Sequence, residues 1–279
     1  MVLPALLAML IMTVYPMLST VYYSFTDFRL LRKNINFTGL KNYINLLTNE
    51  YFIASIWNTV KFSLLSVSFE MIAGFFVALY VNSLKSIRLQ KIMRTLILLP
   101  YLLPTVTAAL SWRMMLSPNY GVVNNVLSAL GLPVYNWFHD IHTAFMMLVV
   151  IDVWQNTPFV FLMIYAAMQS IPADQYKAAR IDGAGTLAQI WYITIPNLKT
   201  ALTLCTLLRT IDTFRIFDKV NLLTGGGPAG STTTITQYIY NNGIKSLKFG
   251  IGSACAIIMT VLVLILSSMY IRDVMNQKG

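Results

Sequence analysis

The sequence contains six apolar stretches that are long enough to cross a lipid bilayer. A membrane-spanning helix needs about 20 predominantly apolar residues, because the hydrocarbon core is about 30 Å thick. The six stretches cover residues 3–25, 59–83, 93–117, 143–168, 199–222 and 251–271. Of the 279 residues, 57% are hydrophobic and 11% are charged, against about 25% charged in soluble domains. These features exclude a soluble globule and predict an all-α integral membrane protein, one domain over residues 1–279 with six transmembrane helices.

The first stretch is expected to remain a spanning helix and not to be a cleaved signal peptide. No basic residue precedes it and it has no small-x-small cleavage site, and we expect the natural start to lie slightly upstream. Basic residues favour the cytoplasmic side of a membrane protein. With both termini inside, the inner connections and the tail carry nine of them: Lys85, Arg88, Lys91, Arg94, Lys177, Arg180, Lys199, Arg272 and Lys278. The outer connections then carry six: Arg29, Arg32, Lys33, Lys41, Lys245 and Lys248. The charge bias predicts that both termini are cytoplasmic.

Composition and isolated motifs argue against several other classes of function. The net charge of +10 is scattered over short loops and forms no basic stripe, so nucleic acid is not an expected partner. Cys205 and Cys255 lie in apolar stretches without metal-ligand spacing. His139 and His142 have no neighbouring cysteine, and no metal site is expected. The run TGGGPAG at 224–230 fits G-x-G-x-x-G, but a dinucleotide site needs a strand before it and a helix after it. Neither a catalytic residue nor a cofactor of its own is expected in this chain.

Polar side chains interrupt the apolar stretches. They are Glu70, Arg113, Asp152, Gln155, Asn156, Arg209, Asp212, Arg215 and Asp218. Such groups are costly at membrane depth and usually face the bundle interior or an aqueous path. From Arg209 to Asp218 charged residues recur every three positions, which keeps them on one drifting stripe of a helix. This stripe is either a self-neutralising ladder or the lining of a cavity. Three prolines, Pro100, Pro104 and Pro158, predict kinks or unwound turns in the third and fourth stretches.

The inner connection at 171–196 is too polar to cross the membrane, yet it carries two helix-start signals. Pro172 suits a first helical position, and Thr186 to Gln189 fits a capping box. A helix, a glycine-bearing turn and a second helix are therefore predicted, with Asp182 placed to cap amides at the turn. Small residues at the tip would let another surface approach the backbone closely: Ala178, Ala179, Gly183, Ala184 and Gly185. The residues alone leave two alternatives, a self-contained elbow or an element that docks onto a partner.

The same segment resembles the EAA loop of permease subunits in binding-protein-dependent ABC importers. That motif, E-A-A-x3-G-x9-I-x-L-P, is matched at Ala178, Ala179, Gly183, Ile193 and Pro196. The resemblance covers nearly the whole chain and is to carbohydrate permeases of the maltose and glycerol-3-phosphate branch. Further matching positions are Phe37, Gly39, Leu40, Asn42 and Tyr43 in the entry segment; Arg94, Pro100, Pro104, Trp112, Pro118, Gly121 and Asn125; and Asp218, Thr224, Gly225, Gly226, Gly227, Pro228, Thr232, Gly250, Ser253 and Ala254.

The resemblance implies a type I ABC importer permease fold and uptake of a sugar or related polar solute. The implied partners are a second permease subunit, two ABC ATPase subunits that bind ATP and Mg²⁺, and an extracytoplasmic solute-binding protein. The implied location is the cytoplasmic (inner) membrane of a bacterium or archaeon, in contact with lipid. Residues expected to couple to the ATPase are Gln175, Tyr176, Lys177, Ala178, Ala179, Asp182, Gly183, Ala184 and Pro196. Lys177 stands where the motif usually has glutamate, so we expect shape-based docking and a carboxylate on the ATPase opposite this lysine.

For the solute path we expect polar groups of the fourth and fifth stretches, because sugar hydroxyls need hydrogen-bond partners. The candidates are Asp152, Gln155, Asn156, Tyr165, Arg209 and Asp212, with Trp154 or Tyr165 offering an aromatic face. A secondary transporter is the alternative, in which Glu70, Asp152 or Asp212 would carry protons or sodium. That class predicts inverted repeats with paired broken helices, and the sequence shows no such repeat. A membrane-embedded enzyme would need a reactive cluster, which the sequence does not contain.

Overall fold

The computed structural model describes residues 3–32 and 34–276, and the regular structure within them is helical. The helices are α1 (Leu3–Ser24), α2 (Lys41–Leu47), α3 (Glu50–Ser83), α4 (Ile87–Leu102), α5 (Thr105–Met115), α6 (Val122–Ala129), α7 (Ile141–Met168), α8 (Ala173–Ile181), α9 (Thr186–Gln189), the π-helix η1 (Ile190–Thr194), α10 (Ile195–Phe214), α11 (Asp218–Leu223), α12 (Ile235–Ile239), the π-helix η2 (Tyr240–Lys245) and α13 (Phe249–Asn276). Lys33 and Lys278, which contribute to the predicted orientation, lie outside the described residues.

Four helices are long and apolar enough to cross a membrane: α1, α3, α7 and α13. The pair α4 and α5 makes a fifth if it is counted as one broken span. The remaining predicted span, 199–222, is divided between α10, which ends at Phe214, and the short α11. Although α10 carries Lys199, Arg209 and Asp212, it packs against α3, α7 and α13. All six predicted stretches are therefore helical, and two of them are interrupted.

The interruption between α4 and α5 lies at a proline. The two helices meet at an angle of 90°, and Pro104 is the N-cap residue of α5. A proline disfavours helical geometry in the residue before it, here Leu103. The Leu103 carbonyl oxygen accepts a hydrogen bond from Gln155 Nε2 on α7 at 2.9 Å, so a neighbouring helix satisfies part of the broken ladder. The break predicted for this stretch is confirmed, whereas α7 continues through Pro158 without interruption.

The core is centred on the long contact between α3 and α7. Close approach depends on Gly74, because a Cβ atom at that position would lie 2.6 Å from Val160 Cγ1. Small residues let helices pack tightly in membranes, where dispersion contacts contribute much of the association energy. The N-terminus of α7 is fixed by Asp140, whose Oδ2 accepts from the backbone N–H groups of Thr143 at 3.0 Å and His142 at 3.1 Å. The Thr143 bond is the main reason that the pKa of Asp140 is lowered from its ordinary value.

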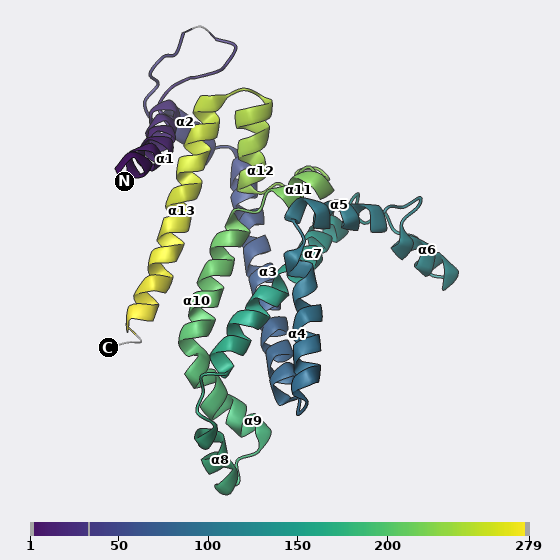
Figure 1. Cartoon of the computed structure of the whole chain (residues 1–279). Helices are drawn as coiled ribbons and strands as arrows, with labels where there is room; N and C mark the ends of the chain where they lie inside the picture. The colour runs from purple at the N-terminus through teal and green to yellow at the C-terminus, as the bar shows by residue number, and fades with distance from the viewer. Residues whose placement is uncertain (1–2, 33, 277–279) are drawn as a thin grey trace.

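The two ends of the bundle differ in character (Figure 1). At one end α8 and α9 project together beyond the long helices, and at the opposite end lie α2 and α12. The long helix α10 runs from the first end toward the middle of the molecule, and the C-terminal end of α13 points in the direction of α8 and α9. In contrast, α1 contacts the bundle through α13. This arrangement isolates the polar connection at 171–196 as a protruding element.

Candidate functional site: a protruding elbow and a polar cavity

The elbow, which is the connection at 171–196 at one end of the bundle, contains a tight turn at a glycine with left-handed backbone geometry. Gly183 has φ +81°, a conformation that costs other residues steric energy. Two hydrogen bonds close the turn at the end of α8. The Ala184 N–H donates to Ala179 O at 2.8 Å, and the Gly183 N–H donates to Arg180 O at 3.2 Å. This pair of bonds is a Schellman motif, which satisfies carbonyl groups left free at a helix end. The predicted glycine turn is confirmed, with a physical reason for glycine at 183.

Local capping in the elbow differs from the sequence prediction. Pro172 is the N-cap of α8 and not its first helical residue. The second helix begins at Thr186 with Gly185 as its N-cap, so the predicted capping box is wrong. Gln189 Nε2 instead donates to Ala184 O at 2.8 Å. Asp182 occupies the C-cap of α8, and within the described residues its carboxylate accepts no hydrogen bond. The glycine backbone makes side-chain capping unnecessary at this turn.

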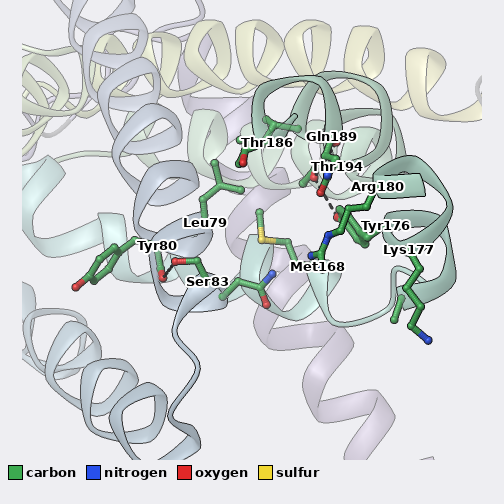
Figure 2. Close-up of a pocket in the computed structure, with 13 residues that line it drawn as sticks. Leu79, Tyr80, Ser83, Met168, Tyr176, Lys177, Arg180, Thr186, Gln189 and Thr194 are labelled. Carbon is green, nitrogen blue, oxygen red and sulfur yellow. Dashed lines mark hydrogen bonds between the residues drawn. The ribbon is translucent and has the colours of Figure 1, made fainter. Parts of the chain in front are cut away.

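The elbow is tied to α10 but leaves a cavity beside α3 and α7. The Tyr176 hydroxyl and Thr194 Oγ1 are 3.0 Å apart, and Asn197 Nδ2 donates to Gln175 Oε1 at 3.0 Å. Pro196 lies in the first turn of α10, where the missing N–H has little cost. A cavity of about 690 Å³ separates the elbow from the C-terminal ends of α3 and α7. Figure 2 shows Leu79, Tyr80 and Ser83 of α3 on one side and Tyr176, Lys177 and Arg180 of the elbow on the other, with Met168 of α7 between them.

The outer surface of the elbow is more apolar than a solvated loop requires. Ile181 and Leu187, on either side of the glycine turn, are 87% and 75% exposed. Ala178 is also exposed on α8. Lys177 Nζ lies 2.8 Å from Asp174 Oδ1 in a solvent-exposed pair, and in Figure 2 its side chain points away from the other labelled residues. The tip therefore exposes two large apolar side chains, one on each side of the glycine turn.

A second cavity lies in the middle of the molecule, where α4 and α5 bend apart. Its volume is about 560 Å³. Five of the six predicted solute-path residues line it: Asp152, Gln155, Asn156, Arg209 and Asp212. Arg215 and Asp218 line it too, so the three-residue charge repeat lines a cavity; of the i,i+3 ion pairs it allows, Arg209 with Asp212 is the one formed within the described residues. Further lining residues are Tyr101 to Thr105, Thr213, Ile216, Phe217 and Lys219.

Tyr165 is the predicted path residue that the structure places elsewhere. It is buried further along α7, where its hydroxyl donates to Gln90 Oε1 at 3.3 Å. The Arg94 guanidinium carbon lies 5.2 Å from the centre of its ring. The alternative aromatic candidate, Trp154, packs edge-on against Trp112 with ring centroids 5.4 Å apart. Neither ring lines the cavity, because both are engaged in contacts between helices.

Four buried charges from four helices meet at the cavity wall, three of them among its lining residues. Arg209 of α10 donates to Glu70 of α3 twice, from Nε to Oε2 at 2.7 Å and from Nη2 to Oε1 at 3.0 Å. Arg209 Nη2 also lies 3.5 Å from Asp152 Oδ2 on α7. Lys219 Nζ of α11 lies 2.5 Å from Asp152 Oδ1. Since two carboxylates face two cations, the network is neutral as a whole, which is how buried charges persist.

Arg209 also reaches one group that the solvent can touch. Its Nη1 lies 3.3 Å from Asp212 Oδ2, and the Asp212 side chain is 60% exposed whereas that of Arg209 is 5% exposed. The arginine is therefore held from behind by Glu70 and Asp152 while it orients Asp212 at the cavity surface. This geometry provides fixed hydrogen-bonding groups for a polar ligand.

Two members of the network, Glu70 and Lys219, were not predicted as site residues. Glu70 is visible in the sequence as a carboxylate inside an apolar stretch, but its partner is 139 positions away. Lys219 lies within the predicted fifth span. A lysine in such a stretch needs a carboxylate partner, and this signal could have placed it with Asp152.

Comparison with known proteins gives consistent matches over nearly the whole chain. Residues 70–278 match the family described as binding-protein-dependent transport system inner membrane component. The trehalose/maltose transport system permease protein MalF of Thermococcus litoralis is 38% identical over 272 residues, which cover 98% of this chain and 91% of that protein.

Two solved structures have the same fold. One is a bacterial ABC transporter involved in the import of the acidic polysaccharide alginate, with TM-score 0.87, 26% identity and coverage of 99% of this chain and 94% of that one. The other is a bacterial alginate ABC transporter in complex with an alginate pentasaccharide-bound periplasmic protein, with TM-score 0.85, 26% identity and coverage of 97% and 91%. With the family match, these likenesses establish a type I permease fold. The chain belongs to the family of binding-protein-dependent transport system inner membrane components.

Proposed function

We propose that this chain is the membrane-spanning permease subunit of an ATP-driven importer for a sugar or related polar solute. The observation that carries this proposal is the elbow: it protrudes from the bundle, its turn is held by the Schellman bonds of Gly183, and its tip exposes Ile181 and Leu187. Large apolar side chains exposed on a polar segment outside the bilayer mark a protein-binding surface. A partner ATPase that receives this tip is the occupant that fits.

The solute class follows from the relatives and from the central cavity. A trehalose/maltose permease and the alginate importers are all concerned with carbohydrates. The cavity between α7 and α10 carries carboxylate, amide and guanidinium groups, which are the groups that bind sugar hydroxyls. This chain would form the translocation path with a second permease subunit, and an extracytoplasmic binding protein would deliver the solute.

The coupling route runs along one helix. Tyr176 on the elbow is bonded to Thr194, which immediately precedes α10. From there α10 extends to Arg209 and Asp212 at the cavity. A displacement of the elbow by a closing ATPase would therefore move cavity groups through a packed helix, as a rigid element transmits motion between two arrangements. Two ATPase subunits, which bind ATP and Mg²⁺, would supply the displacement.

The membrane orientation follows from the same assignment. The elbow faces the cytoplasm because ATPase subunits act there, and the C-terminal end of α13 points the same way (Figure 1). The loop charges of the sequence favour cytoplasmic termini. We place the chain in the cytoplasmic membrane of a bacterium or archaeon, with both termini inside.

A secondary transporter would use the buried carboxylates as proton or sodium carriers. Both oxygens of Glu70 accept hydrogen bonds from Arg209. Those of Asp152 are taken by Arg209 and by Lys219 with Asn156. Fully engaged carboxylates are poor carriers, and the network favours a structural role for them.

Site-specific cross-linking tests the proposed docking. The two cysteines of the chain, Cys205 and Cys255, are buried, so a cysteine introduced at exposed Ala178 can be cross-linked selectively. We expect the Ala178→Cys protein to cross-link to a co-purified ATPase subunit identified by mass spectrometry. The matched control is Ala129→Cys at the exposed end of α6, which should not cross-link to it. An ATPase adduct from Ala129→Cys alone, or no ATPase in the purified complex, would refute the proposal.

A further inference from the structure

Among the residues that the structure describes, the central cavity contains a buried hydrogen-bond acceptor without a partner. Gln155 is 4% exposed and lines the cavity, and its buried Oε1 has no hydrogen-bond partner among the described residues. The orientation of this amide is fixed, because its Nε2 donates to Leu103 O, and a carbonyl can only accept. Buried polar atoms are nearly always satisfied. A bound molecule with a hydrogen-bond donor would therefore satisfy Gln155 Oε1.

The charges around the cavity are balanced. Three carboxylates line it, Asp152, Asp212 and Asp218, together with three cations, Arg209, Arg215 and Lys219. Arg209 and Lys219 are already paired with buried carboxylates. Arg215 is therefore the one lining cation that makes no ion pair within the described residues, and it shares the cavity with two exposed carboxylates.

This balance disfavours an anionic ligand. A sugar acid or sugar phosphate would need an excess of unpaired cations, as charged ligands that lose water require compensation. Here it would meet one available guanidinium and the carboxylates of Asp212 and Asp218. A sugar hydroxyl, in contrast, can donate to Gln155 Oε1 or to Asp212 without bringing a charge.

We propose that the central cavity takes an uncharged polyhydroxylated solute, whose hydroxyl groups donate to Gln155 Oε1 and to the Asp212 carboxylate. Arg209 is a positioning residue that holds Asp212. This inference rests on the proposed importer function and narrows its solute to neutral sugars or polyols, to the exclusion of sugar acids and sugar phosphates.

The test uses proteoliposomes that contain the complete transporter, with its binding protein outside and ATP inside. Six radiolabelled probes are compared: maltose, trehalose and sucrose as uncharged compounds, and glucuronate, glucose 6-phosphate and glycerol 3-phosphate as anions. We expect ATP-driven accumulation of at least one uncharged probe and of none of the anions.

Three variants test whether the transported sugar is bound in the central cavity. Gln155→Met removes the free acceptor, and Asp212→Ala removes a carboxylate whose side chain is 60% exposed. Each should lower the uptake rate of the transported sugar about tenfold, the equivalent of one lost hydrogen bond, with assembly unchanged. Gln169→Met on the exposed end of α7 is the matched control and should transport normally.

Uptake of any anion, or normal rates in both cavity variants, overturns the inference and leaves the importer function intact. If none of the six probes accumulates in an ATP-dependent manner, both the inference and the importer function are contradicted.

Discussion

Arg209 of α10 and Glu70 of α3 form a bidentate ion pair inside the protein, with Nε to Oε2 at 2.7 Å and Nη2 to Oε1 at 3.0 Å. The two residues are 139 positions apart, and the pair joins the helix that leaves the elbow to the longest helix of the bundle. Because Arg209 also orients Asp212, the pair connects the fold with the cavity that we assign to the solute.

Removal of one partner of this pair should destabilise the protein strongly. Glu70→Gln leaves the Arg209 charge buried without its main partner, which typically costs about 3–5 kcal/mol. The thermal unfolding midpoint of the purified complex, followed by tryptophan fluorescence, should fall clearly. Asp174→Asn, which breaks the exposed pair with Lys177, should change it little. In the double variant Glu70→Gln/Arg209→Met the unfolding midpoint should fall less than in Glu70→Gln. An equal or larger fall in the midpoint would contradict the pairing.

The left-handed turn at Gly183 predicts a position-specific effect of alanine. A non-glycine residue in this region costs about 1 kcal/mol, so in Gly183→Ala the Ala184 amide, which donates to Ala179 O, should exchange with deuterium about fivefold faster. Gly185 has φ −67° and equally open surroundings, so Gly185→Ala should exchange normally. Equal rates in the two variants would show that the turn does not depend on glycine at 183.

Lys177 tests the electrostatic part of the docking. If a carboxylate of the ATPase faces this lysine, Lys177→Glu should weaken ATPase binding about tenfold and reduce transport. Asp174→Asn leaves the Lys177 charge in place while it removes the intrachain partner, and should bind normally. Unchanged assembly and transport in Lys177→Glu with the native ATPase would rule out the pairing, and docking would then depend on shape alone.

Asp140 predicts a pH dependence at the start of α7. The pKa of Asp140 is lowered from its ordinary value of 3.8, chiefly by the Thr143 backbone N–H. Its stabilisation is therefore complete above about pH 5, where the carboxyl is ionised in the unfolded chain too, and is lost as the pH falls through the lowered pKa. Asp140→Asn keeps an N-cap acceptor that does not titrate. The unfolding midpoint of the natural protein, measured relative to that of Asp140→Asn, should fall between about pH 5 and about pH 3; a constant difference would contradict the assignment.

Much of the fold can be read from the lengths of apolar stretches. The predicted spans at 143–168 and 251–271 lie within α7 and α13, because a bilayer demands such lengths. The start of α3 at Glu50 is harder to predict, since polar residues in its first turns face other protein segments and not lipid. The end of α10 at Phe214 is equally hard to predict, because no glycine or proline marks it and Ile216, Phe217 and Val220 continue the apolar pattern.

The two candidate sites also contain features that the sequence predicts and features that it does not. The glycine turn of the elbow is local, and its residue pattern predicts it. The pairing of Arg209 with Glu70 is not local: sequence periodicity puts charges on one face of a helix but does not say which helix that face meets. Lys219 could be recognised only as a buried cation that requires a partner. The unsatisfied oxygen of Gln155 depends on the bend at Pro104, which directs the Leu103 carbonyl to the other end of the amide.

The most direct test of the coupled, ATP-driven function is solute uptake into proteoliposomes that contain this chain with its co-purified permease and ATPase subunits. The solute is chosen by thermal stabilisation of the cognate binding protein across a panel of sugars, and ionophores collapse all ion gradients. The structure predicts accumulation that requires ATP at the ATPase face and stops when the ATPase subunits are omitted. Accumulation driven by an imposed proton or sodium gradient, in parallel vesicles without ionophores and without ATPase subunits, would contradict it.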